Sequence, residues 1–182
     1  SQTDTEVVAH LQQNRVTFGV CLFQHHPVGL DTRVLYREYF GFFCGPPHRL
    51  YGRKDIDASE LRNEDAVSFQ TDELDGPLFA VAQMRNRLGL RADLRGLSSS
   101  LPEVRRMIVA NIGIGALPVH VASRDVKTGQ LWQLPPYKSL AAVDIHVLTN
   151  ARRSMNRAER SLLDMLNAEL DAVPLSERMY RA

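Results

Sequence analysis

Stretches in which apolar residues recur at helical spacing alternate along this chain with short, continuous apolar runs. The helical spacing predicts helices over residues 3–12, 57–63, 78–88, 101–110 and 156–170. The apolar runs predict strands over residues 16–23, 39–44, 66–70, 92–97, 112–117, 130–134 and 142–149. Because strands and helices alternate, the pattern indicates an α/β protein with a mainly parallel sheet.

The most informative stretch runs from residue 96 to residue 118, GLSSSLPEVRRMIVANIGIGALP. It is typical of a serine-rich turn, an amphipathic helix, a left-handed stop and a buried strand that ends at Pro118. Ser100 and Glu103 have the S-x-x-E spacing of a capping box. Asn111 follows the last helical residue, where the backbone is commonly left-handed and Asn replaces Gly.

Four further expectations concern the two ends of the chain. Thr3 and Glu6 have capping-box spacing before the first helix, and the run 16–23 is apolar enough for a strand buried on both faces. The last helix carries leucines at core spacing, and the tail 171–182 is expected to be frayed. The leucines are Leu162, Leu163, Leu166 and Leu170.

Composition narrows the class of protein. The chain of 182 residues is 44% hydrophobic and 24% charged, which is ordinary for a folded soluble domain. A formal net charge of +1 gives no electrostatic footprint for nucleic acid. We find no membrane span and no signal-peptide pattern, and two cysteines make no disulfide framework. These features predict a cytoplasmic protein with reduced thiols.

The order and spacing of these elements resemble the effector-binding domain of LysR-type transcriptional regulators. The resemblance is carried by TEVVAHLQQNRVTFGV, FGFFCGPPHRLYGRKDIDASEL, SSSLPEVRRMIVANIGIGALP, GQLWQLP and NRAERSLLDML. It implies a two-lobed, periplasmic-binding-protein-like (type 2) α/β fold with two chain crossovers. Residues 1–44 and 142–182 would then form lobe I, and residues 45–141 would form lobe II.

The chain departs from the family pattern in two ways. It starts after the strand and helix that normally open the effector domain, and the winged helix-turn-helix that binds DNA does not precede it. Asn111 also replaces the usual first Gly of the helix stop. The resemblance therefore implies a fragment of a regulator that contacts DNA only through its N-terminal domain and forms a homo-oligomer, a dimer or tetramer in the full-length protein.

The resemblance also implies a small-molecule effector in the cleft between the lobes. A helix N-terminus favours anionic groups, which suits the serine turn, with Ser100 as the cap and Ser98 and Ser99 freer to bind. The alternative is that the serines only cap the helix. The predicted effector-binding residues are Gln24, Cys44, Gln70, Thr71, Ser98, Ser99 and Ser100.

Other chemistries are less consistent with the sequence. The spacing of His25, His26, His48 and Cys44 fits no zinc pattern, and Gly113 and Gly115 lack the third Gly and the context of a nucleotide loop. No G-x-S-x-G elbow supports a hydrolase. Cys21 and Cys44 form either a redox pair or, as we expect, two buried inert thiols.

The function predicted is that of a ligand-sensing domain of a bacterial LysR-type transcription factor, which binds a small anionic or polar effector. It would not be an enzyme and would need no metal or cofactor. The alternative function is that of a solute-binding protein of a transport system, which shares the two-lobed architecture.

Overall fold

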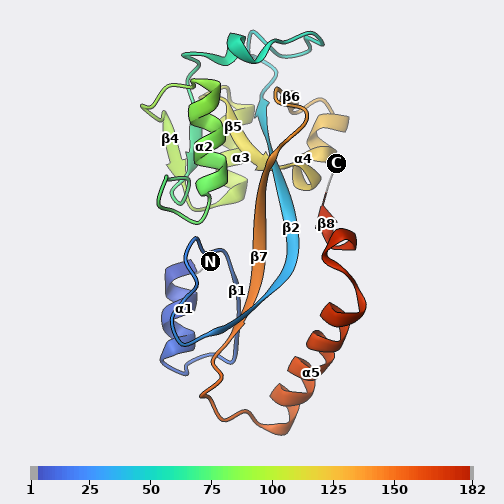
Figure 1. Cartoon of the computed structure of the whole chain (residues 1–182). Helices are drawn as coiled ribbons and strands as arrows, with labels where there is room; N and C mark the ends of the chain where they lie inside the picture. Colours follow the sequence, from blue (N-terminus) through green and yellow to red (C-terminus); the bar gives the residue numbers. More distant parts are fainter. Residues whose placement is uncertain (1–3, 181–182) are drawn as a thin grey trace. The chain divides into compact units, whose positions relative to one another are not determined.

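The computed structural model describes residues 4–180, which form two compact units (Figure 1). One unit comprises residues 4–37 and 144–180, and the other comprises residues 38–143. The chain passes from one unit to the other inside two strands, β2 (Asp31–Cys44) and β7 (Ala141–Thr149).

The unit of residues 4–37 and 144–180 is built on the pairing of β1 (Phe18–Cys21) with β7, which is antiparallel. Helix α1 (Asp4–Gln12) packs on β1 so closely that a Cβ at Gly19 would lie 2.5 Å from Val7 Cγ1. The core of this unit contains the buried residues Leu11, Cys21, Leu30 and Leu148, with Val7, Val8, Val16 and Phe23 packed against them.

Two expectations for the start of the chain need comment. Thr3, one half of the predicted capping box, lies outside the described residues; the helix is described from Asp4, whose carboxylate accepts a 3.1 Å hydrogen bond from Leu22 N. The prediction that the first strand is buried on both faces was wrong. Val20, in the middle of β1, is 53% exposed because its side chain points away from the core under α1.

Helix α5 (Arg157–Ala172) forms where the leucine spacing predicted a helix. Asn156 accepts a 2.9 Å hydrogen bond from Glu159 N, and the Glu159 carboxylate accepts one of 2.8 Å from Asn156 N, so a capping box starts the helix. The leucines are not all in the core, however. Leu170 is buried, whereas Leu162 is 55% exposed, because only one side of this helix packs on its unit.

The predicted fraying of the tail was wrong for residues 173–180. After a 3-10 turn (Leu175–Glu177), strand β8 (Met179–Tyr180) pairs with β2. The Arg178 guanidinium donates to Val34 O at 2.7 Å and to Leu35 O at 2.5 Å, and Arg37 N donates to Arg178 O at 2.9 Å. One arginine thereby ties the end of the chain to β2, which helical spacing alone does not reveal.

The unit of residues 38–143 carries the strands β3 (Val67–Phe69), β4 (Gly96–Ser98), β5 (Gly115–Pro118) and β6 (Trp132–Leu134). The prediction of a mainly parallel sheet was wrong. β2 pairs antiparallel with both β5 and β6, whereas β3 pairs parallel with β4, and a parallel bridge joins Ala66 to Ile114. Alternation of strands and helices implies parallel strands only where a helix connects two strands that are adjacent in the sheet. In this unit that holds for β3 and β4.

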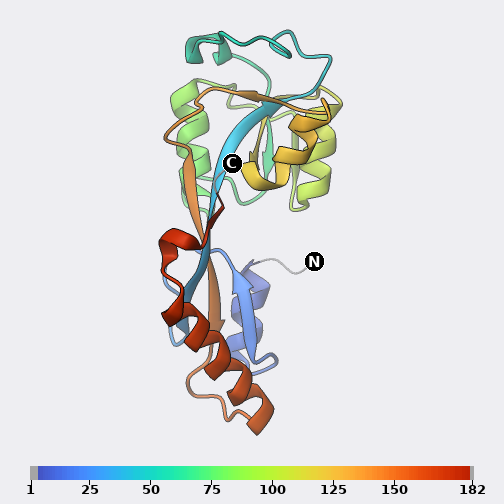
Figure 2. The same ribbon diagram turned by 90° about the vertical axis from the view of Figure 1, so that its right-hand side faces the viewer.

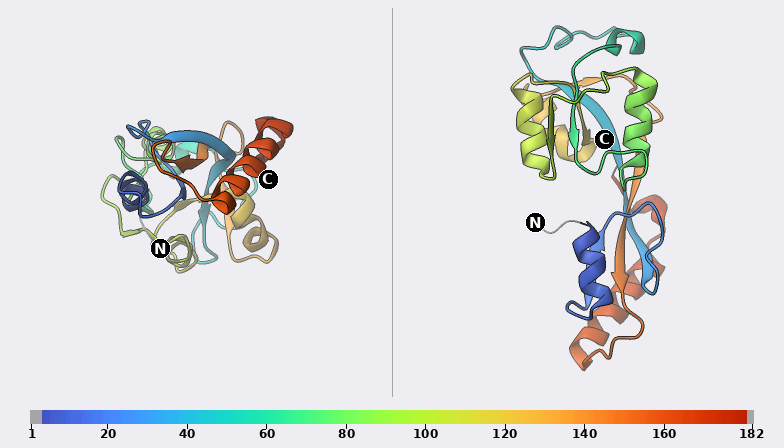
Figure 3. Two further views of the ribbon diagram at one scale, coloured as in Figure 1. Left: turned by 90° about the horizontal axis from the view of Figure 1, so that it is seen from below. Right: turned by 90° about the vertical axis from the view of Figure 1, so that its left-hand side faces the viewer.

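Helices α2 (Phe79–Leu88) and α3 (Leu101–Val109) lie on opposite sides of β3, as Figure 2 and the right-hand view of Figure 3 show. Both helices end as predicted. Gly89 has a φ of 69° after α2, and Asn111 has a φ of 58° after α3. Because glycine and asparagine tolerate the left-handed region, these two residues fix where each helix stops.

Helix α4 (Val119–Lys127) was not predicted. It begins directly after Pro118, which the apolar pattern marks as the end of a strand. Arg105 of α3 donates two hydrogen bonds to the Asp125 carboxylate of α4, at 2.5 and 2.7 Å. This bidentate ion pair joins the two helices on the side of α3 that points away from the core.

We predict that Arg178→Ala destabilises the chain by about 2 kcal/mol, because it removes charge-assisted hydrogen bonds to partly buried carbonyls of β2. Urea unfolding measures the loss, and hydrogen exchange at the Arg37 amide should accelerate. The matched control is Arg160→Ala, which removes an exposed arginine of α5. Equal stability of the two variants would contradict the anchoring role.

Candidate functional site

The carboxyl ends of β3 and β4 lie together because these strands are parallel and in register. Phe69 is opposite Ser98, and Gln70 N donates to Ser98 O at 3.2 Å. The buried side chains of Val67 and Phe69 hold β3 in the core, so the polar residues after it emerge at the strand ends. The structure thus places Gln70 and Thr71 beside the serines that precede α3.

The turn after Thr71 is compact. Leu78 N donates to Thr71 O at 3.2 Å, which closes the turn onto the start of α2. A Cβ at Gly76 would lie 2.4 Å from Thr71 O, so only glycine leaves room for this approach of backbone to backbone. The Asp75-Gly76-Pro77 sequence therefore fixes the position of Thr71 as well as the start of the helix.

The three serines have different surroundings. Ser98 is 8% exposed; its hydroxyl donates to the Glu103 carboxylate and accepts a 3.0 Å hydrogen bond from Ser100 N. Ser99 is exposed, and among the described residues no hydrogen bond engages its hydroxyl. Ser99 is therefore the serine best placed to meet a ligand.

The predicted capping box between Ser100 and Glu103 was wrong. Ser100 takes the N-cap position of α3 but its side chain makes no capping hydrogen bond. The other half of the box is replaced as well, because Ser100 N donates to the Ser98 hydroxyl, and that hydroxyl donates to the Glu103 carboxylate. Ser98, expected to be freer to bind, instead holds the first turn of the helix in place.

A buried ionic cluster lies behind Gln70 and Thr71, and the sequence analysis missed it. Asp72 is only 2% exposed; the Ser68 hydroxyl donates to its carboxylate, and Arg85 Nη2 donates to its main-chain oxygen at 3.2 Å. Arg85 Nε is 3.7 Å from Asp72 Oδ2. No local pattern in the sequence marks this cluster, because Arg85 and Asp72 meet only when α2 is packed in the folded chain.

Burial raises the pKa of Asp72 to about 6, against the opposing effects of the Ser68 hydrogen bond and the Arg85 charge. Buried polar atoms in this cluster lack a hydrogen-bond partner among the described residues, namely Asp72 Oδ1, Arg85 Nε and Arg85 Nη1. An unpaired buried carboxylate oxygen favours the protonated acid. Asp72 thus has a raised pKa of about 6 and lies beside the strand ends.

Cys44 lies at the end of β2, opposite Trp132 of β6, and is 1% exposed. Burial raises the pKa of its thiol to about 12, and the charge of Glu64 adds to this rise. Burial likewise raises the pKa of Cys21 to about 11. Both cysteines are free and buried, which supports the expectation of inert thiols over a redox pair.

Gln24 follows β1 in the unit of residues 4–37 and 144–180, and it is exposed. Of the histidines considered for a metal site, His48 is engaged by Glu64, with Nε2 3.3 Å from the carboxylate. Within residues 4–180, no group of three or more His, Cys, Asp or Glu side chains is placed to hold a metal ion.

Comparison with known proteins assigns the family. The model of the LysR substrate binding domain matches residues 1–171. The chain belongs to this family. Its α/β structure agrees with the periplasmic-binding-protein-like type 2 fold of LysR substrate-binding domains, so the predicted family and fold class are confirmed.

Solved structures of similar fold are regulatory domains. The CcmR regulatory domain of Synechocystis PCC6803, in complex with 2-PG, has a TM-score of 0.72 and 17% identity, with 95% of this chain and 82% of that chain covered. The apo regulatory domain of HypT from Salmonella typhimurium has a TM-score of 0.71 and 12% identity, with 94% and 81% covered.

A third similar structure is the C-terminal domain of a probable LysR family regulator from Rhodococcus sp. RHA1, with a TM-score of 0.68 and 13% identity, and with 92% of this chain and 82% of that chain covered. No curated protein matches the chain. At these identities the structural likeness establishes the fold, and the family assignment rests on the match over residues 1–171.

We predict that Asp72 makes stability depend on pH. Because its pKa in the folded chain, about 6, is higher than its ordinary value of 3.8, folding favours the protonated acid. The stabilisation is fully present below about pH 4 and is lost as the pH rises through about 6. Asp72→Asn is neutral at every pH, so its stability relative to the parent chain should rise by about 2 kcal/mol between pH 4 and pH 7.5.

Urea unfolding at the two pH values measures this difference. Asp75→Asn is the matched control, because Asp75 is an exposed aspartate of the same turn. A parent chain and Asp72→Asn variant with parallel pH profiles would refute the assignment of the titration to Asp72.

Proposed function

We propose that this chain is the effector-sensing domain of a LysR-type transcriptional regulator and that residues at the ends of β3 and β4 contact the effector. The observation that carries the proposal is the register of these strands, which gathers Gln70, Thr71 and Ser99 beside the start of α3. The family match supports a regulatory domain over a solute-binding protein of transport.

The chemistry of the strand ends favours a small anionic or polar effector. The start of α3 presents main-chain amides and the positive end of the helix dipole. Ser99 adds an exposed hydroxyl, while Gln70 adds an exposed amide. A similar structure, the HypT regulatory domain, is known with a bromide ion bound, which supports an anion as one class of ligand here.

The roles of the predicted residues differ within this proposal. Ser99, Gln70 and Thr71 contact the effector, while Ser98 and Ser100 shape the first turn of α3. The assignment of Cys44 rests on the resemblance to the family, and that of Gln24 rests on its place after the first strand; both stay predictions. Cys44, as a neutral buried thiol, offers at most a weak hydrogen bond.

Regulation follows if the effector prefers one conformation of the domain. A ligand shifts a conformational equilibrium only by its difference in affinity for the two states. Contacts in a homo-oligomer, a dimer or tetramer, transmit this shift to DNA-binding domains that lie outside this chain. The regulator acts in the cytoplasm, and the domain catalyses no reaction. No helix in the described part of the chain combines the length and apolar character needed to cross a bilayer.

A thermal-shift screen of small carboxylates against the chain tests this proposal. A ligand at one hundred times its Kd adds about 2.7 kcal/mol of stability, which appears as a higher Tm. We predict that Ser99→Ala weakens the binding of a hit roughly tenfold, since it loses a hydrogen bond to a charged group. Ser176→Ala, an exposed serine of the other unit, is the control.

The outcome that would contradict the site is a hit whose affinity is the same for the parent chain, Ser99→Ala and Ser176→Ala. Loss of affinity in both variants would instead indicate a general effect on folding, which urea unfolding of the two variants identifies. A hit that is retained by Ser176→Ala and weakened by Ser99→Ala supports both the site and the sensing function.

A further inference from the structure

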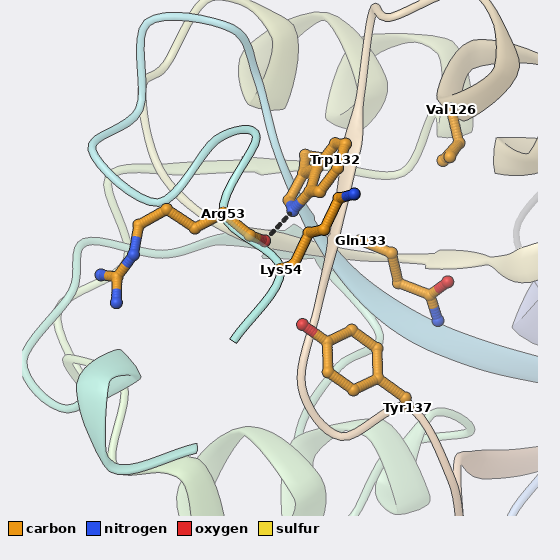
Figure 4. Close-up of a pocket in the computed structure, with 6 residues that line it drawn as sticks. All are labelled: Arg53, Lys54, Val126, Trp132, Gln133 and Tyr137. Atoms are coloured by element: carbon orange, nitrogen blue, oxygen red, sulfur yellow. Dashed lines mark hydrogen bonds between the residues drawn. The ribbon is translucent and has the colours of Figure 1, made fainter. Parts of the chain in front are cut away.

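A cavity of about 250 Å³ lies within the unit of residues 38–143 (Figure 4). It is formed by the segment after β2, by α4, by β6 and by the residue that follows β6 after two prolines. It shares no lining residue with the strand ends of β3 and β4. The lining residues are Arg53, Lys54, Val126, Trp132, Gln133 and Tyr137.

The indole of Trp132 is held in a fixed orientation. Its Nε1 donates to Arg53 O at 2.9 Å, the dashed line in Figure 4. The Tyr51 ring packs on it with centroids 5.7 Å apart, and the Tyr51 hydroxyl donates to Gly129 O at 2.7 Å. Because these contacts exist without a ligand, an aromatic molecule meets an ordered surface and loses little entropy in arranging it.

The positive charge available to a ligand here is that of Lys54. The Arg53 guanidinium donates to both carboxylate oxygens of Glu60, at 2.6 and 3.2 Å, and Figure 4 shows it turned away from Trp132 and Tyr137. Among the described residues, none forms an ion pair with Lys54, which lines the cavity directly. A carboxylate that reaches the Lys54 ammonium would therefore gain a new charge-assisted contact.

Tyr137 offers a hydroxyl to a ligand in this cavity. Burial raises the pKa of its phenol, and the negative charge of Asp55 raises it further, so the hydroxyl stays protonated and can donate. Figure 4 shows this hydroxyl directed to the side of the cavity on which Trp132 and Lys54 lie. Of the two cations in the lining, Arg53 is paired with Glu60 and only Lys54 is left for a ligand, so a monoanion fits better than a dicarboxylate or a phosphate.

We propose that this cavity is a binding site for a small aromatic monocarboxylate. The aromatic ring packs against Trp132 and Val126, and the carboxylate pairs with Lys54. The volume suits one ring with a short side chain, because a cavity of roughly 150 Å³ already accommodates benzene. The site is separate from the strand ends of β3 and β4, so the proposal does not rest on the function proposed above.

Trp132 is the single tryptophan of the chain, so its fluorescence reports on this cavity. Phenylacetate is the probe, and phenylacetamide is its neutral counterpart. We expect phenylacetate to produce a saturable change in emission and to bind roughly tenfold more tightly than phenylacetamide. Lys54→Met should weaken phenylacetate by the same factor and leave phenylacetamide unchanged. Lys127→Met, at the end of α4, is the matched control and should bind like the parent chain.

Three results would overturn the proposal. They are the absence of a saturable change up to about 10 mM phenylacetate, equal binding of the two compounds, and equal phenylacetate affinity in Lys54→Met and Lys127→Met. Trp132 emission that changes with protein concentration in the absence of phenylacetate would show that a second copy of the chain covers the cavity. This result would also overturn the proposal. Ser99→Ala should not alter the titration, which separates this cavity from the proposed effector site.

Discussion

The backbone hydrogen bonds of β2 are the constraint on which the rest of the structure depends. A strand of fourteen residues has donors and acceptors along both edges, and buried ones must be paired. β7, β5, β6 and β8 all pair with it. The four strands come from distant parts of the sequence. The donors and acceptors of β2 are therefore all paired only after most of the chain has folded.

The proposed effector site depends on a different kind of pairing. β3 and β4 are short and parallel, and they offer few hydrogen bonds of their own. Two contacts nearby hold the ends of these strands. Gly76 leaves room for the Thr71 carbonyl, and the Ser98 hydroxyl links β4 to Glu103. The residues that we propose to contact the effector are therefore positioned by a buried serine and a glycine that need not touch a ligand themselves.

The sequence predicts those features that depend on local chemistry. Gly89 and Asn111 end their helices because the left-handed conformation is intrinsic to those residue types, and the leucine spacing identifies α5. Predictions were wrong where two side chains of the folded chain compete for the same hydrogen-bonding group. The S-x-x-E spacing is compatible with a capping box, but Ser98 approaches Glu103 only once β4 is in place. The docking of the tail by Arg178 and the burial of Asp72 likewise depend on contacts that no local pattern contains.

The burial of the two cysteines makes the chain suitable for site-specific labelling. With pKa values of about 11 and 12, Cys21 and Cys44 hold fewer than about one thiolate in a thousand at pH 7, and each is at most 4% exposed. Maleimide reagents, which are attacked by the thiolate form of cysteine, will pass over both residues in the folded chain. A cysteine introduced at an exposed position can then carry a fluorophore or spin label while the native cysteines stay in place.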